Sequence, residues 1–190
     1  LFTDDGCDGN SGGVYIGGNA GSVVVTNTTI KENKTLNKAG YPQNLKIGGV
    51  SASGNITITD SKITDNKGAG VKLSSSNNTI LSHSEITNNY KGLELGSGNN
   101  FTLNHLTIAD NSASGIYLIN SSFAITNSII WGNGEDDNSG GSIAGLVYGD
   151  DEILNVGGSI SYSAIESYCS GDTVPDECGV CYGDGSSCGE

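Results

Sequence analysis

The sequence predicts an all-β solenoid, a parallel β-helix of about six coils of ~22 residues each. Only 35% of the 190 residues are hydrophobic and 30 are glycine, so the chain can fill a narrow core but not a wide one. Isoleucine followed three residues later by asparagine recurs at steps of 33, 23, 22 and 22 residues. The runs between the glycines alternate apolar and polar residues, and no apolar stripe at helical spacing is long enough for a helix.

Each repeat contains three short strands. The first follows a glycine and points one apolar residue inward, in a file predicted to contain Val14, Val50, Val71, Leu93, Ile116 and Leu146. The second covers residues 23–25, 56–58, 79–81, 101–103, 123–125 and 158–160. The third holds the recurring isoleucine, at Ile30, Ile63, Ile86, Ile108 and Ile130, and we expect Ile165 to end this file. Coils stacked ~4.8 Å apart then share backbone hydrogen bonds.

A column of asparagines follows the third strand, at Asn33, Asn66, Asn89, Asn111 and Asn133. Asparagine tolerates the left-handed backbone angles of a tight corner and can hydrogen-bond the backbone groups of the turn. Repeated in each coil, its amides can also form a ladder. We therefore interpret this column as scaffold and expect its members to occupy left-handed corners.

A second polar column precedes the third strand and contains both histidines of the chain. Its members are Asn27, Asp60, His83, His105 and Asn127. Because its outer members are asparagine, we interpret Asp60, His83 and His105 as part of a second polar ladder. A metal site or an acid–base pair made by the two imidazoles is the alternative.

Two insertions interrupt the repeat, about residues 34–48 and 134–144, and both leave the coil at the same corner. Between them the first strands present Ser51, Lys72, Glu94 and Tyr117 outward. We name this face the trough and predict it as a binding surface, because loops on a rigid scaffold commonly carry binding. The predicted binding residues are Tyr41, Lys46, Lys72, Glu94, Tyr117 and Trp131. The alternative is that surface corners simply tolerate insertions.

Charge is divided along the chain. The net charge is −13, with +1 in residues 1–91 (eight Lys, seven acids) and −14 in residues 92–190 (fourteen acids, no base). An acidic chain without arginine lacks the phosphate-neutralising surface of a nucleic-acid binder. No apolar run approaches the ~20 residues needed to cross a bilayer as a helix, so we expect no membrane insertion. The near-neutral and acidic ends could instead favour end-to-end association of the protein with itself.

Acidic loops rich in Asp, Asn and Gly suit Ca²⁺, which prefers oxygen ligands, and Ca²⁺ is the one cofactor the sequence suggests. The candidate ligands are Asp4, Asp5, Asp8, Asp136, Asp137 and Asn138. A solvated acidic surface is the alternative for both loops.

The ends of the chain differ from the repeat. We expect residues 1–12 to form an acidic N-terminal loop that continues from an upstream part, residues 13–167 the β-helix, and residues 168–190 a cysteine-rich linker or cap. The tail contains Cys169, Cys178, Cys181 and Cys188, predicted to form two disulfides with three pairings open, or alternatively a zinc site. Cys7 is left without a predicted partner.

The repeat unit seen at residues 125–133, with Ile125, Asn127, Ile130 and Asn133, resembles the right-handed parallel β-helix repeat. That family includes pectate lyases, polygalacturonases, phage tailspikes and bacterial surface proteins, and the resemblance covers residues 13–167. The tail resembles a cysteine-rich segment that recurs in some bacterial secreted proteins. Leucine-rich repeats are the rival, because residues 106–111 match their pattern; other coils carry Thr or Ser at its first position.

The resemblance indicates a fold and not an activity. Enzymes of this family use an Arg or Lys base beside Ca²⁺-binding carboxylates, or three clustered aspartates. Here arginine is absent, and Lys72 with Glu94 is the one base–carboxylate pair expected on the trough. We therefore expect a non-enzymatic, secreted or cell-surface module with a structural or adhesive role that binds extracellular polysaccharide. The alternative is a polysaccharide lyase or glycoside hydrolase acting between the insertions.

Overall fold

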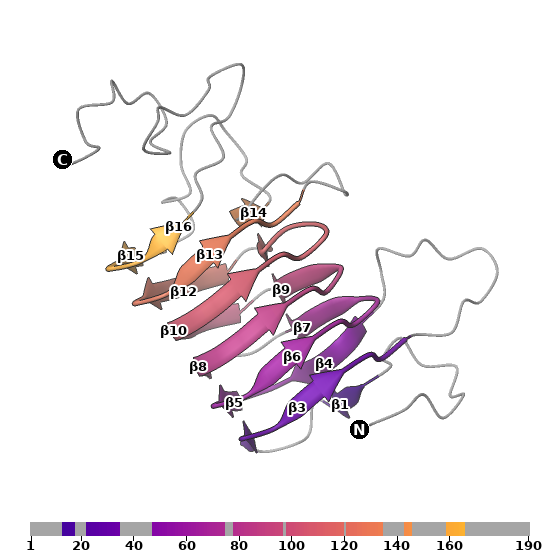
Figure 1. Cartoon of the computed structure of the whole chain (residues 1–190). Helices are drawn as coiled ribbons and strands as arrows, with labels where there is room; N and C mark the ends of the chain where they lie inside the picture. Colours follow the sequence, from indigo (N-terminus) through magenta and orange to yellow (C-terminus); the bar gives the residue numbers. More distant parts are fainter. Residues whose placement is uncertain are drawn as a thin grey trace.

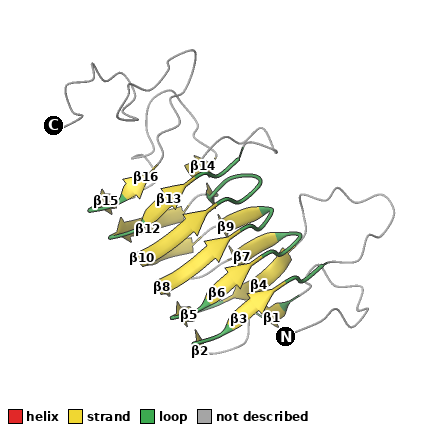
Figure 2. Ribbon diagram, viewed as in Figure 1, coloured by secondary structure: helices red, strands yellow, loops and turns green. Residues whose placement is uncertain are grey.

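The computed structural model describes residues 13–17, 22–34, 47–74, 78–96, 98–119, 121–134, 143–145 and 159–165. Strands of successive coils lie side by side in this part of the chain (Figure 1). Its regular elements are strands joined by short loops, and it contains no helix (Figure 2). Nothing in the described ranges is a helix long and apolar enough to span a membrane.

One side of the molecule is a six-stranded parallel sheet that takes one strand from each coil. Its strands, in spatial order, are β1 (Val14–Ile16), β4 (Ile47–Ser53), β7 (Ala69–Ser74), β9 (Lys91–Leu95), β11 (Ile116–Leu118) and β14 (Ile143–Gly145). Val71 pairs with Val50 in the coil before and with Leu93 in the coil after, as the repeat predicts. The sheet order therefore follows the chain order, which defines a solenoid.

The rest of the tube is a ten-stranded parallel sheet that bends at a corner. Its first wing contains β2 (Val23–Thr26), β5 (Ile56–Thr59), β8 (Thr79–Thr87), β10 (Gly98–Ala109), β12 (Ser121–Thr126) and β15 (Ser159–Ser161). The second wing contains β3 (Thr29–Lys31), β6 (Lys62–Thr64), the later halves of β8 and β10, β13 (Ile129–Trp131) and β16 (Ala164–Ile165). Because β8 and β10 continue through the corner, they belong to both wings.

The core is a set of aliphatic files along the axis. Ile63, Ile86 and Ile108 stack in register in the second wing and are fully buried. Ile130 pairs with Ile165, so the predicted place of Ile165 next to Ile130 is confirmed. Side chains alternate between inward and outward along each strand, so only the inward ones need to be apolar. A chain of low hydrophobic content can therefore fill a narrow core.

The last coil differs from the prediction. Ile143, not Leu146, occupies the position next to Ile116, so the predicted strand at Gly145 is wrong and Gly145 instead pairs with Leu118. Both insertions are also shorter than expected. Strand β4 already begins at Ile47, and β14 already includes residues 143 and 144. The strands re-enter the sheet earlier because backbone pairing with the neighbouring coil, and not the position of a glycine, sets their start.

The left-handed corner residues also differ in part. The column Asn27, Asp60, His83, His105 and Asn127 has φ between 49° and 51°. At the other corner, the left-handed residue is the one before each ladder asparagine: Glu32, Asp65, Asn88, Asp110 and Gly132. The expectation that the ladder asparagines themselves are left-handed is therefore wrong. They adopt ordinary backbone angles because their amides bond between coils and do not close the turn.

Several predicted features lie outside the described residues. These are the candidate Ca²⁺ ligands Asp4, Asp5, Asp8, Asp136, Asp137 and Asn138, the binding residues Tyr41 and Lys46, and the tail cysteines Cys169, Cys178, Cys181 and Cys188. Cys7 and most of both insertions lie outside them as well. These features remain predictions.

Candidate functional site

The trough is the outer face of the six-stranded sheet, where equivalent positions of neighbouring coils pair. Ser51 pairs with Lys72, Lys72 with Glu94, and Glu94 with Tyr117. The Lys72 Nζ lies 2.6 Å from Glu94 Oε1, and the Glu94 side chain is only 12% exposed. The predicted column is therefore in register and its central members form an ion pair, but Ser51 is buried, with only 7% of its surface exposed.

A second lysine lies beside this pair. The Lys91 Nζ lies 4.1 Å from the centre of the Tyr117 ring, a cation–π contact. Lys91 is 7% exposed although it lies at the start of β9. The repeat does not predict this contact, because Lys91 and Tyr117 are 26 residues apart, which is not one period.

This cluster can hold a polar ligand more readily than it can perform catalysis. The Glu94 carboxylate accepts from Lys72, so the two charges neutralise each other. Glycoside hydrolysis needs two suitably spaced carboxylates. Among the described residues Tyr15, Ser51, Lys72, Glu94 and Tyr117, which pair along the trough, Glu94 supplies the one carboxylate.

The opposite corner carries the second polar column. The His83 and His105 rings stack with centroids 4.7 Å apart and planes 8° apart. Next to them is a shallow depression of about 360 Å³, lined by Asn27, Thr28, Thr29, Asp60, Ser61, Lys62, His83 and Glu85. At its edge the Lys62 Nζ lies 2.8 Å from Glu85 Oε2. This hydrogen-bonded Glu85 carboxylate raises the pKa of Lys62.

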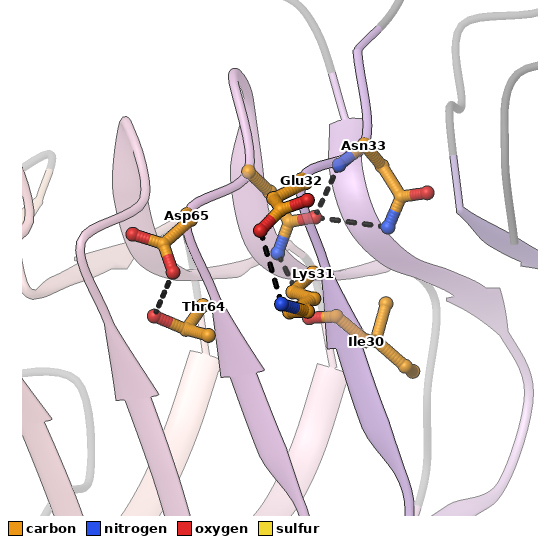
Figure 3. A network of polar contacts seen from close by, with 7 residues as sticks. Ile30, Lys31, Glu32, Asn33, Thr64 and Asp65 are labelled. Carbon is orange, nitrogen blue, oxygen red and sulfur yellow. Dashed lines mark hydrogen bonds and ion pairs between the residues drawn. The ribbon is translucent and has the colours of Figure 1, made fainter. Parts of the chain in front are cut away.

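The asparagine ladder closes the corner between the third strand and the trough (Figure 3). The Asn33 backbone N–H and Nδ2 both donate to Asn66 Oδ1, at 3.1 and 3.0 Å. The Asn66 Nδ2 in turn donates to the carbonyl of Ile30 at 3.3 Å. Beside it lie the Lys31–Glu32 ion pair, which is exposed, and the Thr64–Asp65 hydrogen bond, which is partly buried, each at 3.0 Å. The predicted amide ladder is therefore confirmed, and it is buried scaffold.

A serine ladder at the histidine corner was not predicted. The Ser61 backbone N–H donates to Ser84 Oγ at 3.1 Å, while the Ser61 hydroxyl donates to the Thr59 carbonyl at 2.7 Å. The same pattern recurs from Thr28 to Ser61, from Leu106 to Ser128 and from Ser128 to Ser163. Serine recurs at this position of the repeat, and this recurrence is the sequence pattern that could have predicted the ladder.

The family is decided by the comparison with known proteins. A family model described as "Right handed beta helix region" matches residues 7–160. The chain belongs to the right-handed β-helix family. Searches of curated proteins and of solved structures gave no match. The leucine-rich repeat alternative is excluded, because the described strands form a parallel β-helix.

Within this β-helix, the predicted binding residues do not form a single site. Lys72, Glu94 and Tyr117 meet in the trough. Trp131 lies on β13 in the second wing of the other sheet and is 51% exposed. It stands beside Ile129, which is likewise about half exposed, and the two form a small apolar surface. Single exposed apolar residues of this kind are normal, so Trp131 is not evidence for a site by itself.

Proposed function

We propose that this β-helix is a non-enzymatic module of the cell surface or the extracellular space, with a structural or adhesive role. The observation that carries the proposal is the uninterrupted buried ladder from Asn33 to Asn133. Each amide from Asn33 to Asn111 donates to the asparagine of the next coil, so the recurring polar residues of the sequence serve rigidity. A stiff rod with exposed polar faces suits a spacer or a display element.

The N-terminal end of the ladder supports association of the protein with itself. Asn33 Oδ1 is one of two buried side-chain atoms in the described part that have no hydrogen-bond partner. In every later coil this oxygen accepts from the asparagine of the coil before. Within the described ranges, strands β1, β2 and β3 likewise pair on one side only. A further coil added at this end, from a second copy, would satisfy these groups.

Sedimentation velocity and negative-stain microscopy at rising protein concentration test this association, with and without Ca²⁺. We expect short rods whose length grows with concentration, and Asn33→Ala to weaken growth by removing the buried acceptor. Asn55→Ala, at an exposed site, is the control. Monomers at every concentration would contradict the association but would leave the rest of the proposal in place.

We further propose that the adhesive partner is an extracellular polysaccharide, held in the trough by Glu94, Lys72 and Tyr117. The net charge of −13 disfavours approach to polyanions, so neutral chains are the better ligands. Affinity electrophoresis in gels containing xylan, β-glucan or polygalacturonate measures this directly. We expect retardation by a neutral polysaccharide that Tyr117→Ala reduces. Equal mobility in all gels would remove the adhesive role.

The second candidate is a polysaccharide lyase or hydrolase, which the closely paired Lys72 and Glu94 favour. Incubation with acidic and neutral polysaccharides, followed by assay for reducing ends and unsaturated products, separates the two candidates. The proposed module gives no products. Turnover that Lys72→Ala or Glu94→Gln abolishes, with the folded state retained, would establish the enzyme instead.

A further inference from the structure

The two histidines of the chain form an exposed stacked pair. His83 lies in β8 and His105 in β10, in neighbouring coils where Ser82 pairs with Asn104 and Ser84 with Leu106. Their φ angles are 49° and 51°, so both side chains leave the backbone in the same direction. The ring planes are 8° apart and the centroids 4.7 Å apart. The coil repeat therefore presents two parallel imidazoles to solvent.

Neither imidazole is held by a polar contact. Among the described residues, neither ring has a hydrogen-bond or ion-pair partner. The corresponding asparagine one coil later differs, because Asn127 Nδ2 donates to Asn104 Oδ1 at 3.0 Å. The imidazole nitrogens are therefore available to a ligand, and the rings can turn about their side-chain bonds at little cost.

The charges around the pair favour a cation. Asp60 occupies the same column one coil before His83, and its carboxylate has no ion-pair partner in the described part. The nearest lysine of the depression, Lys62, is neutralised by Glu85 at 2.8 Å. The corner beside His83 therefore carries a net negative charge, which attracts a metal ion and does not repel it.

The ring separation is close to that of a chelate. Zinc binds imidazole nitrogens at about 2.0–2.1 Å, so two nitrogens on one ion lie about 3 Å apart. The centroids of the two parallel rings are 4.7 Å apart, so the ligating edges of the rings must come closer by roughly 1.5 Å. Because the lone pairs of the nitrogens lie in the ring planes and these planes are almost parallel, both exposed rings must also tilt out of the stack, by rotation about their side-chain bonds, to direct their nitrogens at one ion. Neutral imidazole prefers zinc, copper and nickel, whereas calcium prefers oxygen ligands.

We propose that His83 and His105 together chelate a divalent ion of the zinc, copper or nickel class, with water completing the coordination. No group of three or more His, Cys, Asp or Glu side chains in the described ranges is placed to hold a metal. The site is therefore a two-imidazole chelate of moderate affinity. It is separate from the trough and independent of the function proposed above.

The imidazole ¹H–¹⁵N resonances of the intact chain report on this site, because the chain has 2 histidines. Zinc chloride added to the folded protein is expected to shift both imidazoles together, with a single saturation curve. Binding of zinc to the tail cysteines would leave these signals in place. Calcium chloride at the same concentrations is the control and is expected to shift neither imidazole. Equal shifts with calcium would overturn the proposal.

Substitution of either histidine separates chelation from binding to a single ring. His83→Asn and His105→Asn place in each slot the residue that Asn27 and Asn127 already supply in the same left-handed conformation. Both variants should therefore fold, which circular dichroism checks. In each variant we expect the remaining imidazole to need at least tenfold more zinc for the same shift. An unchanged zinc titration of the remaining imidazole would show that the two rings do not act together and would refute the chelate.

Discussion

Asn89 is bonded to Asn111 of the next coil by two hydrogen bonds to the same oxygen. The Asn89 backbone N–H and its Nδ2 donate to Asn111 Oδ1 at 3.0 and 3.2 Å. The second hydrogen of Nδ2 reaches the carbonyl of Ile63 in the coil before, at 3.0 Å. One buried amide therefore connects three coils, and the stacking of the tube depends on it as much as on the aliphatic files.

Asn89→Ala should destabilise the protein by about 3–5 kcal/mol. The substitution leaves the N–H and Nδ2 of Asn66 without their acceptor, because both donate to Asn89 Oδ1. It also removes the donor to Ile63, and a buried polar group left unpaired costs about 1–3 kcal/mol. Urea unfolding followed by circular dichroism measures the loss. Asn55→Ala is the control, because Asn55 is exposed and accepts one bond; a similar loss in both variants would contradict the ladder.

Gly92→Ala should also destabilise the protein strongly. A Cβ at Gly92 would overlap the carbonyl oxygen of Gly115 and lie 2.7 Å from Ile108 Cγ2. Backbone of the next coil cannot move away without loss of the sheet pairing, so we expect a cost of about 3 kcal/mol. Gly17→Ala is the matched control, since the nearest atom to its Cβ is Tyr15 Cε1 at 3.8 Å. Thermal unfolding of both variants measures the difference, and equal midpoints would show that the close coil contact is wrong.

The register of the tube follows from the sequence because equivalent positions of a parallel solenoid must stack. One period separates Ile86 from Ile108, and the two pair as predicted. Periodicity fails where an insertion interrupts it. Gly145 opens an apolar run like those of the other coils, yet Ile143 takes the place beside Ile116. A strand that returns after a long insertion is aligned by backbone pairing, which the local pattern does not encode.

The corner geometry and the trough show a second limit of prediction from the repeat pattern. The column of ladder asparagines suggested left-handed corners, but Asp65 and Asp110, one residue earlier, hold the positive φ. Asp, Asn or Gly stands at this position in most coils, directly before the ladder asparagines, and residues of these types favour positive φ. The sequence therefore contained the signal for the left-handed residue, but the positive φ was assigned to the asparagine that follows it. The Lys72–Glu94 pair follows from the period, whereas the contact of Lys91 with Tyr117 is diagonal between coils and no period predicts it.

Ile86→Ala should cost about 2–5 kcal/mol, because Ile86 is fully buried in the middle of its file and the rigid coils around it cannot collapse into the space. Ile80→Ala, at a side chain 44% exposed on the same strand β8, should cost less than about 1 kcal/mol. Urea unfolding of the two variants shows which of the two side chains points into the core. If the Ile80 variant were the less stable one, the assignment of inner and outer faces would be reversed.

The Lys62–Glu85 pair should give a pH dependence at alkaline pH. Glu85 raises the pKa of Lys62 above its ordinary value of 10.5, and Asp65 contributes in the same direction. A group whose pKa is higher in the folded state stabilises it fully below the unfolded pKa, and this stabilisation is lost as the pH rises through the folded value. The pair therefore adds a constant contribution near neutral pH that disappears above pH 10.5. Glu85→Gln should lower the pKa of Lys62 toward 10.5, as ¹³C NMR of the lysine Cε measures. The same titration curve for Lys62 in both proteins would show that the ion pair is not formed in solution.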